Sequence, residues 1–159
     1  MQLLTKGIEE EVYTGRKDGT LIGVSHKVAS DIPQFQYEPD CRNTEYATHP
    51  WREYDCLEKE IKRFRCQLLR YLRAHDDLVM VPGSSLLLGD SSKFVRSDPS
   101  NPYHSVIEDK YFTDVVTASI HINIGIEDQE ALIRACRVLR CEAFVYLALT
   151  ACSPWLDGK

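Results

Sequence analysis

The sequence predicts an α/β or α+β fold, in which helices pack on a β-sheet. Segments with strand patterns are separated by segments of helical periodicity along 159 residues, a length that fits one domain. Hydrophobic residues make up 43% of the chain and charged residues 27%, which is ordinary for a globular protein and excludes a disordered one. No apolar stretch approaches the ~20 residues of a membrane-spanning helix.

The net charge, the N-terminal residues and the spacing of the cysteines together predict a soluble cytoplasmic protein. The formal net charge of −5 gives no basic footprint for a nucleic-acid partner, and no membrane partner is expected. The N-terminal run MQLLTKGIEEE becomes acidic at once and lacks the apolar core of a signal peptide. None of the six cysteines forms a C-x-x-C pair, so buried free thiols in a reducing compartment are expected.

Two strands and two helices are predicted in the first half of the chain. Residues 3–13 form a strand that ends at the turn over 17–19, and a short helix over 20–31 follows. Residues 42–48 form the second strand. The clearest helix covers 52–74, where apolar residues recur every three or four positions: Tyr54, Leu57, Ile61, Phe64, Leu68 and Leu72. Its basic outer face is interpreted as solvated surface rather than a phosphate site.

The middle of the chain is dominated by a long polar stretch. Residues 77–81 form a short strand that is closed by Pro82 and Gly83. The stretch that follows, to His104, is rich in Gly, Ser, Pro and Asp, and such long loops are usually functional or disordered. A short helix over 103–110 comes next.

The last third is predicted as a strong strand and a long helix. The strand covers 115–125, and the helix covers 128–150 with Asp128 as its N-cap. Four side chains of this helix are expected to point inward: Leu132, Ala135, Leu139 and Phe144.

Alternation along the strands places polar residues together on one face. Glu9 and Glu11 share a face, with Glu10 on the other. Along 115–125 one face carries Thr117, Ser119, His121 and Asn123, and the opposite face carries Val116, Ala118, Ile120, Ile122 and Ile124. Because an α/β sheet is normally apolar on both faces, two interpretations stand: a water-facing antiparallel sheet, or a metal-phosphate site.

The metal interpretation depends on ligand chemistry. Carboxylates and a neutral imidazole can hold Mg²⁺ or Mn²⁺, with waters or phosphate oxygens completing the coordination. Glu9 and Glu11 repel each other unless a cation lies between them. Glu45, on the strand RNTEYAT, is a third candidate ligand.

The order of the motifs adds a resemblance that covers essentially the whole chain. The runs are GIEEEVYTG (7–15), EPDCRNTEYAT (38–48), PGSSLLLGDSSKFVRSDPSNPYH (82–104), VVTASIHINIG (115–125) and ACSPWLDGK (151–159). In this order they resemble the glutamate–cysteine ligases of the bacterial and plant-like type, which are carboxylate–amine ligases with a glutamine-synthetase-like catalytic fold. The resemblance implies an α+β fold with a mainly antiparallel sheet, helices on one face, and a polar metal and nucleotide face.

The resemblance also implies an activity. The protein would join the γ-carboxyl of glutamate to the amine of cysteine, with ATP as co-substrate and Mg²⁺ or Mn²⁺ as cofactor, through an acyl phosphate. This is the first step of glutathione biosynthesis. Phosphoryl transfer depends mainly on positioning and charge neutralisation, so no cysteine of the chain has to be catalytic.

Position by position, the resemblance assigns site residues. The metal ligands are Glu9, Glu11, Glu45 and His121, of which the first two match a G-x-E-x-E motif. Asn123 and Asp98 are expected to bind the cofactor nucleotide, and Arg96 is the expected catalytic residue. Arg42 and Asn43 lie in matching motifs without an assigned role, and Lys93 is interpreted as a solvated loop charge.

Length and two local departures separate this chain from that family. Cys41 stands where a small polar residue is usual, and the run THP (48–50) stands where Thr-Pro-Pro is commoner. Because the family's members are more than twice as long, residues 1–159 are expected to be the N-terminal portion of one ligase domain, with an uncovered strand edge and helix surface. The alternatives are a non-catalytic domain that binds a divalent metal or a partner chain, and a ligase with another amine acceptor. Homo-oligomers and pairing with the missing half are both open.

Overall fold

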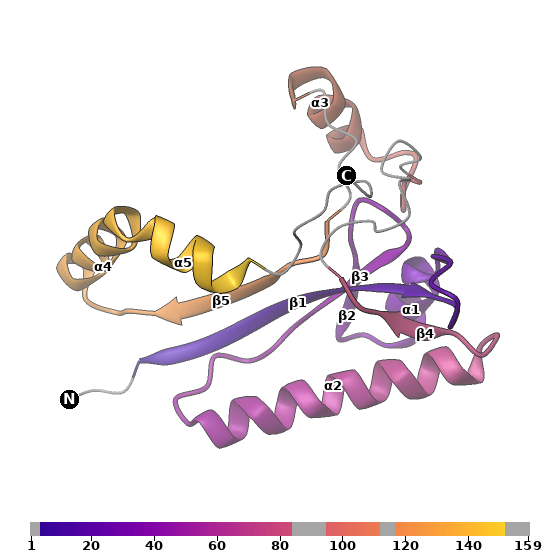
Figure 1. The fold of residues 1–159 in the computed structure, drawn as a ribbon, viewed down its shortest axis with the longest axis horizontal. Coiled ribbons are helices and arrows are strands. Elements are labelled where there is room, and N and C mark those ends of the chain that lie inside the picture. The colour runs from indigo at the N-terminus through magenta and orange to yellow at the C-terminus, as the bar shows by residue number, and fades with distance from the viewer. Residues whose placement is uncertain (1–3, 84–94, 112–116, 152–159) are drawn as a thin grey trace.

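The strand β1 (Thr5–Gly15) lies at the centre of a five-stranded sheet (Figure 1). One edge of β1 pairs with β3 (Asn43–Ala47), which in turn pairs with β2 (Phe35–Tyr37). The other edge pairs with β5 (Ile120–Gly125) along the first half of β1 and with β4 (Val79–Val81) along its end. All four pairings are antiparallel, so the predicted α+β class with an antiparallel sheet is confirmed.

This computed structural model describes residues 4–83, 95–111 and 117–151. Lys93, interpreted above as a solvated loop charge, and the part of the long polar stretch over residues 84–94 lie outside the described residues. None of the described helices is both long enough and apolar enough to cross a bilayer. The five described cysteines are free thiols, but the prediction that they are buried was wrong: Cys41 and Cys56 are half-buried, and Cys66, Cys136 and Cys141 are exposed.

Two helices, α1 (Ser25–Asp31) and α2 (Tyr54–Ala74), cover one face of the sheet. Four side chains of the predicted stripe of α2 are buried at helical spacing: Leu57, Phe64, Leu68 and Leu72. Glu60, which was not predicted, is buried as well, whereas Ile61 is only half-buried. The core beneath them unites both helices with the sheet: Val12, Val24, Val28, Ile32, Phe35, Tyr46, Phe64, Leu68, Leu72 and Leu78. Tyr54 was expected in this stripe but is 72% exposed, and the Lys6 ammonium lies 4.3 Å from its ring centroid.

A buried carboxylate on α2 fixes the loop that follows β3. Glu60 is only 6% exposed and accepts hydrogen bonds from the His49 backbone N–H (3.0 Å) and from the Trp51 indole (2.6 Å). Burial opposes ionisation of Glu60, but the hydrogen bonds from Trp51 and His49 outweigh it and lower the pKa of this carboxyl. Trp51 also forms a β-bridge with Lys6 of β1. The loop is therefore held between the helix and the central strand, which fixes where β3 ends.

Several predicted boundaries shift in the structure. The helix predicted over 20–31 begins only at Ser25, because Leu21 forms a β-bridge with Gly15 instead. The three-residue strand β2 was not predicted. Of the strand predicted over 115–125, the described part is a continuous strand only from Ile120. The short helix α3 (Pro102–Tyr111) lies where a helix was expected.

The helix predicted over 128–150 is two helices, α4 (Gln129–Cys141) and α5 (Ala143–Thr150). Asp128 caps α4 as predicted, since its Oδ1 accepts a hydrogen bond from the Ala131 N–H at 2.6 Å. The inward orientation was wrong for three side chains: Leu132 is 41% exposed, Leu139 49% and Phe144 72%. Neither helix buries a residue against the described part of the chain. Figure 1 shows both at the end of the sheet opposite to α1 and β4.

Candidate metal site on the polar face of the sheet

The register of three strands brings the predicted carboxylates and imidazole to one face. Glu9 lies between Ala47 of β3 and His121 of β5, and Glu11 lies opposite Glu45. Glu10 points to the helix-covered face, where its carboxylate accepts a hydrogen bond from the Tyr46 hydroxyl. The alternation that the sequence predicts is therefore present, with the helices on the side away from Glu9 and Glu11.

Glu9 and His121 form a pair across β1 and β5. The His121 Nδ1 lies 3.0 Å from Glu9 Oε2, and its Nε2 lies 3.1 Å from the Ser119 hydroxyl. The hydrogen bond to Glu9 raises the pKa of His121 above its usual value. Burial opposes this increase, and the charges of Glu11, Glu9 and Glu45 add to it. The imidazole is thus oriented by one carboxylate and held within the field of two others.

Glu11 is held by the backbone of the segment before β5. Its Oε2 accepts a hydrogen bond from the Ser119 N–H at 2.9 Å, and a longer one from the Asn43 amide at 3.4 Å. The same Asn43 amide donates to the Thr117 carbonyl at 3.0 Å. Asn43 is 2% exposed, and its Oδ1 has no hydrogen-bond partner among the described residues. Asn43 therefore fixes the position of Glu11 and leaves a buried acceptor beside the site.

Glu38, a carboxylate outside the predicted ligand set, completes a cluster of three. Oxygens of Glu11, Glu38 and Glu45 all lie within 4.8 Å of one another. Glu38 lies in the run EPDCRNTEYAT, but its place depends on β2, whose Gln36 pairs with Glu45. The tight connection back to β3, with the Glu38 N–H 3.5 Å from the Asn43 carbonyl, turns Glu38 toward Glu45. The strand β2 is too short to show a period in the sequence. The only sequence signal for Glu38 is that it is a carboxylate in the same run as Glu45.

Burial and like charge raise the pKa values of this cluster. Burial, followed by the charges of Glu11 and Glu45, raises the pKa of Glu38 to about 7. Burial also raises the pKa of Glu45, although a hydrogen bond from Glu38 opposes the increase. Without a cation, Glu38 therefore keeps its proton at pH values where an ordinary glutamate is ionised, and donates it toward Glu45.

The donor set fits a hard divalent cation. Three carboxylates whose oxygens converge can replace part of the hydration shell of Mg²⁺ or Mn²⁺, and waters or phosphate oxygens supply the remaining ligands. A divalent charge would also relieve the repulsion from Glu11 and Glu45 that, after burial, raises the pKa of Glu38. Of the four predicted ligands, the structure groups Glu11 and Glu45 in this cluster and pairs Glu9 with His121 beside it.

The structure also places three residues that the resemblance assigned to the site: Asn123, Arg96 and Asp98. Asn123 is opposite Gly7 and lines a cavity of about 230 Å³ that also contacts Glu9. The backbone of Arg96 forms a bridge with Asp40, close to Glu38 along the chain. Asp98 accepts hydrogen bonds from the N–H and hydroxyl of Ser100, at 2.9 and 2.6 Å. The roles assigned to these three residues stay predictions.

Arg42 has a structural partner. It is 8% exposed, and its guanidinium donates two hydrogen bonds to Asp40, at 2.8 and 2.7 Å. The second Asp40 oxygen also accepts the Val95 N–H at 2.9 Å. This buried pair fixes the segment 95–97 against the turn between β2 and β3, and so supports the backbone on which Glu38 lies.

Replacement of Glu38 by glutamine is expected to change the pH dependence of stability. A glutamate whose pKa is raised from 4.5 to about 7 makes the folded state bind more protons than the unfolded state in that interval. The free energy of unfolding of the metal-free protein should therefore fall as pH rises between these values. Glu38→Gln should flatten this fall and stabilise the protein above pH 7, since its amide still donates to Glu45. Urea unfolding in EDTA across this pH range measures the effect.

The exposed Glu58 supplies the matched control. Glu58 lies on the outer face of α2 beside Lys62, which lowers the pKa of its carboxyl through a hydrogen bond. In Glu58→Gln, the free energy of unfolding should still fall as pH rises from 4.5 to 7, as in wild type, because Glu38 is unchanged. An equal slope in wild type and Glu38→Gln would show that Glu38 is not the group that titrates.

Comparisons with known proteins agree with the sequence motifs. The profile of glutamate-cysteine ligase family 2 matches residues 5–159. The protein named “Putative glutamate–cysteine ligase 2-1” of Rhodococcus jostii is 25% identical over 164 residues, which cover 98% of this chain and 43% of that protein. The chain thus spans less than half the length of this relative. No solved structure matches the chain, so the glutamine-synthetase-like form of the fold stays a prediction.

Proposed function

The chain belongs to glutamate-cysteine ligase family 2, and from this premise we propose that its polar sheet face forms part of the catalytic site of an ATP-dependent ligase. The reaction would join the γ-carboxyl of glutamate to the amine of cysteine. The observation that carries the proposal is the convergence of Glu11, Glu38 and Glu45 on one face, beside the pair of Glu9 and His121.

The chemistry requires a surface that tolerates several negative charges at once. The γ-carboxylate attacks the terminal phosphorus of ATP, which releases ADP and gives an acyl phosphate. The cysteine amine then attacks the acyl carbon, loses a proton, and releases inorganic phosphate as the amide forms. A bound Mg²⁺ or Mn²⁺ would supply charge neutralisation for the phosphoryl group.

The residues of the chain act by binding and positioning. Glu11, Glu38 and Glu45 would hold the cation, and the Ser119 N–H keeps Glu11 in place. His121 would be a further ligand whose ring Glu9 orients, as carboxylates commonly do for ligating imidazoles. Asn123 and Asp98 would bind the nucleotide, and Arg96 would bind a carboxylate or phosphate oxygen of the substrates.

Phosphate release tests this function. The chain is incubated with Mg²⁺, ATP, glutamate and cysteine, and each substrate is omitted in turn. Release that requires glutamate and is increased by cysteine is the expected result, and Glu11→Gln should abolish it while the exposed Glu58→Gln leaves it unchanged. Replacement of cysteine by other amines then identifies the acceptor. Metal binding without glutamate-dependent release would contradict ligase activity in this chain.

A second candidate function rests on the uncovered apolar surface. Ile120 and Ile122 of β5 are 61% and 68% exposed, and large apolar side chains of α4 and α5 are exposed as well: Leu132, Ile133, Val138, Leu139, Phe144, Val145, Leu147 and Leu149. Monomeric proteins rarely expose a contiguous apolar area of this kind. The alternative is therefore a metal-binding chain that pairs with another polypeptide, either a second copy or a chain with the remaining ligase strands. It predicts Mn²⁺ binding without phosphate release.

A further inference from the structure

A buried carboxylate lies directly behind the candidate metal site, on the helix-covered face of the sheet. Glu10 is 5% exposed and stands on β1 between Glu9 and Glu11, whose side chains point to the polar face. Opposite Glu10 on β3 is Tyr46, which follows Glu45 in the chain and is fully buried. Because successive residues of a strand point to opposite faces, this buried pair lies behind the facing carboxylates of Glu11 and Glu45.

The two carboxylate oxygens of Glu10 join three elements of the fold. Its Oε2 accepts a hydrogen bond from the Tyr46 hydroxyl of β3, and its Oε1 lies 3.0 Å from the Arg65 guanidinium of α2. The Tyr46 ring is itself held by Phe35 and Phe64, at centroid distances of 5.6 and 5.0 Å. A hydrogen bond to a charged group is stronger than a neutral one, and a buried group that loses its partner is costly. The contact therefore holds β1 against β3 at this position.

The polar face of the same two strands carries a repulsion that this contact opposes. Glu11 and Glu45 are directly opposite each other in the pairing of β1 with β3, where like charges destabilise a sheet. Oxygens of both lie within 4.8 Å of each other and of Glu38, so the carboxylate cluster requires the two strands to stay close. The hydrogen bond between Glu10 and Tyr46 is placed to limit how far the two strands can separate.

We propose that Glu10 is a positioning residue of the metal site, which acts through its hydrogen bond with Tyr46. The bond holds β1 and β3 at the spacing at which Glu11 and Glu45 bind one cation together. Glu10 is not a ligand, because its carboxylate lies on the other face of the sheet. Ligands that are already in place bind a metal more tightly, since binding does not include the cost of bringing them together. The inference rests on the metal site of the proposed function, but it requires only cation binding and not ligase activity.

Two other roles of Glu10 make different predictions. If its negative charge attracted the cation through the sheet, removal of that charge would weaken cation binding even when the hydrogen bond is kept. If Glu10 contributed only to the stability of the fold, the cation affinity of the folded chain would not depend on its hydrogen bond. The positioning role predicts that affinity follows the hydrogen bond with Tyr46, and neither the charge nor the overall stability.

Two variants separate the hydrogen bond from the charge. Tyr46→Phe removes only the hydroxyl and leaves every charge of the chain in place. It should weaken Mn²⁺ binding about tenfold, the lower end of the range for groups that orient metal ligands. The double variant Glu10→Gln with Arg65→Gln removes both charges of the ion pair but keeps an acceptor for the Tyr46 hydroxyl, so it should bind Mn²⁺ as wild type does. Isothermal titration measures the affinities, and urea unfolding of the same samples measures their stability.

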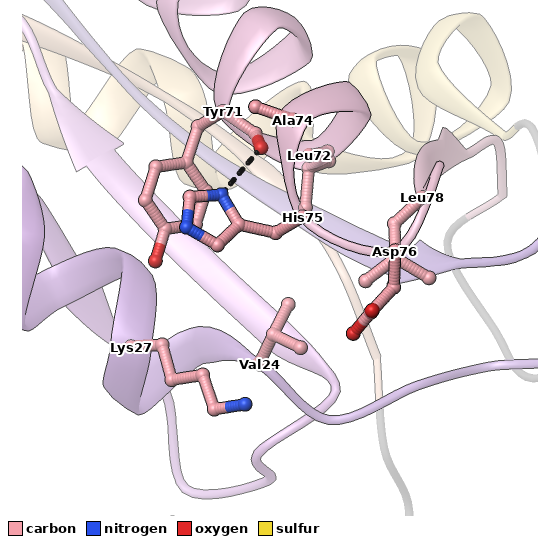
Figure 2. Close-up of a pocket in the computed structure, with 8 residues that line it drawn as sticks. All are labelled: Val24, Lys27, Tyr71, Leu72, Ala74, His75, Asp76 and Leu78. Atoms are coloured by element: carbon pink, nitrogen blue, oxygen red, sulfur yellow. Dashed lines mark hydrogen bonds between the residues drawn. The ribbon is translucent and has the colours of Figure 1, made fainter.

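Leu72→Ala is the control for a general loss of stability. Leu72 is fully buried about two turns after Arg65 on α2, and with Val24 and Leu78 it lines a cavity of about 180 Å³ (Figure 2). This variant should be less stable, but its folded form should bind Mn²⁺ as wild type does. Unchanged affinity in Tyr46→Phe, or an equal loss in the double variant or in Leu72→Ala, would overturn the inference. Failure of wild type to bind Mn²⁺ would instead contradict the proposed metal site itself, and the inference with it.

Discussion

Replacement of Phe64 by alanine is expected to lower the free energy of unfolding by about 3–5 kcal/mol, the range for buried phenylalanines. Phe64 is 1% exposed, and its ring contacts Phe35 and Tyr46 at centroid distances of 6.0 and 5.0 Å. Removing it opens a cavity at the point where α2, β2 and β3 meet. Urea unfolding followed by circular dichroism measures the change.

Phe144 provides a control of the same residue type. It lies on α5 and is 72% exposed, so Phe144→Ala should change the free energy of unfolding by no more than about 0.5 kcal/mol. A loss of several kcal/mol in Phe144→Ala would mean that α5 packs against something in solution, which the second candidate function predicts for a chain with a bound partner.

Replacement of Glu11 by glutamine is expected to weaken Mn²⁺ binding at least about 100-fold, because loss of groups that merely orient metal ligands already costs 10–100-fold. Glu11 belongs to the carboxylate cluster and also accepts a hydrogen bond from the Ser119 backbone N–H. The glutamine carbonyl can still accept the Ser119 N–H, so the fold should be kept while one negative charge is lost. Isothermal titration with Mn²⁺ measures the affinity.

The pH dependence of this affinity provides a further check. Glu38, with a pKa of about 7 in the metal-free protein, must lose its proton to act as a ligand, so Mn²⁺ affinity should rise as pH increases through that value. Glu58→Gln, on the exposed face of α2, should bind Mn²⁺ as wild type does. Equal affinities of Glu11→Gln and wild type would show that the cation binds elsewhere.

The polar face could be predicted from the sequence because strand side chains alternate with a period of two. The positions of Glu9 and Glu11 on one face and Glu10 on the other follow from that period alone, and the structure confirms them. The buried stripe of α2 was predicted from helical spacing in the same way. Both patterns depend only on local geometry, which a single sequence contains.

Features that depend on contacts between elements could not be predicted. Glu38 joins the cluster through the pairing of a three-residue strand, and that pairing has almost no periodic signal. The apolar faces of α4 and α5 were identified, but their pattern does not reveal what covers them, so the inward orientation of Leu139 and Phe144 was wrong. Likewise, the motif position of Arg42 gave no sign of its pairing with Asp40.

Paramagnetic broadening by Mn²⁺ tests the central claim, that this face binds a divalent cation, most directly. The amide signals of the isotope-labelled chain are recorded while Mn²⁺ is added below stoichiometric amounts. We expect selective loss of the signals around Glu11, Glu38, Glu45 and Ser119, and no selective loss in Glu11→Gln. Broadening centred on other acidic residues, or the same pattern in Glu11→Gln, would contradict it.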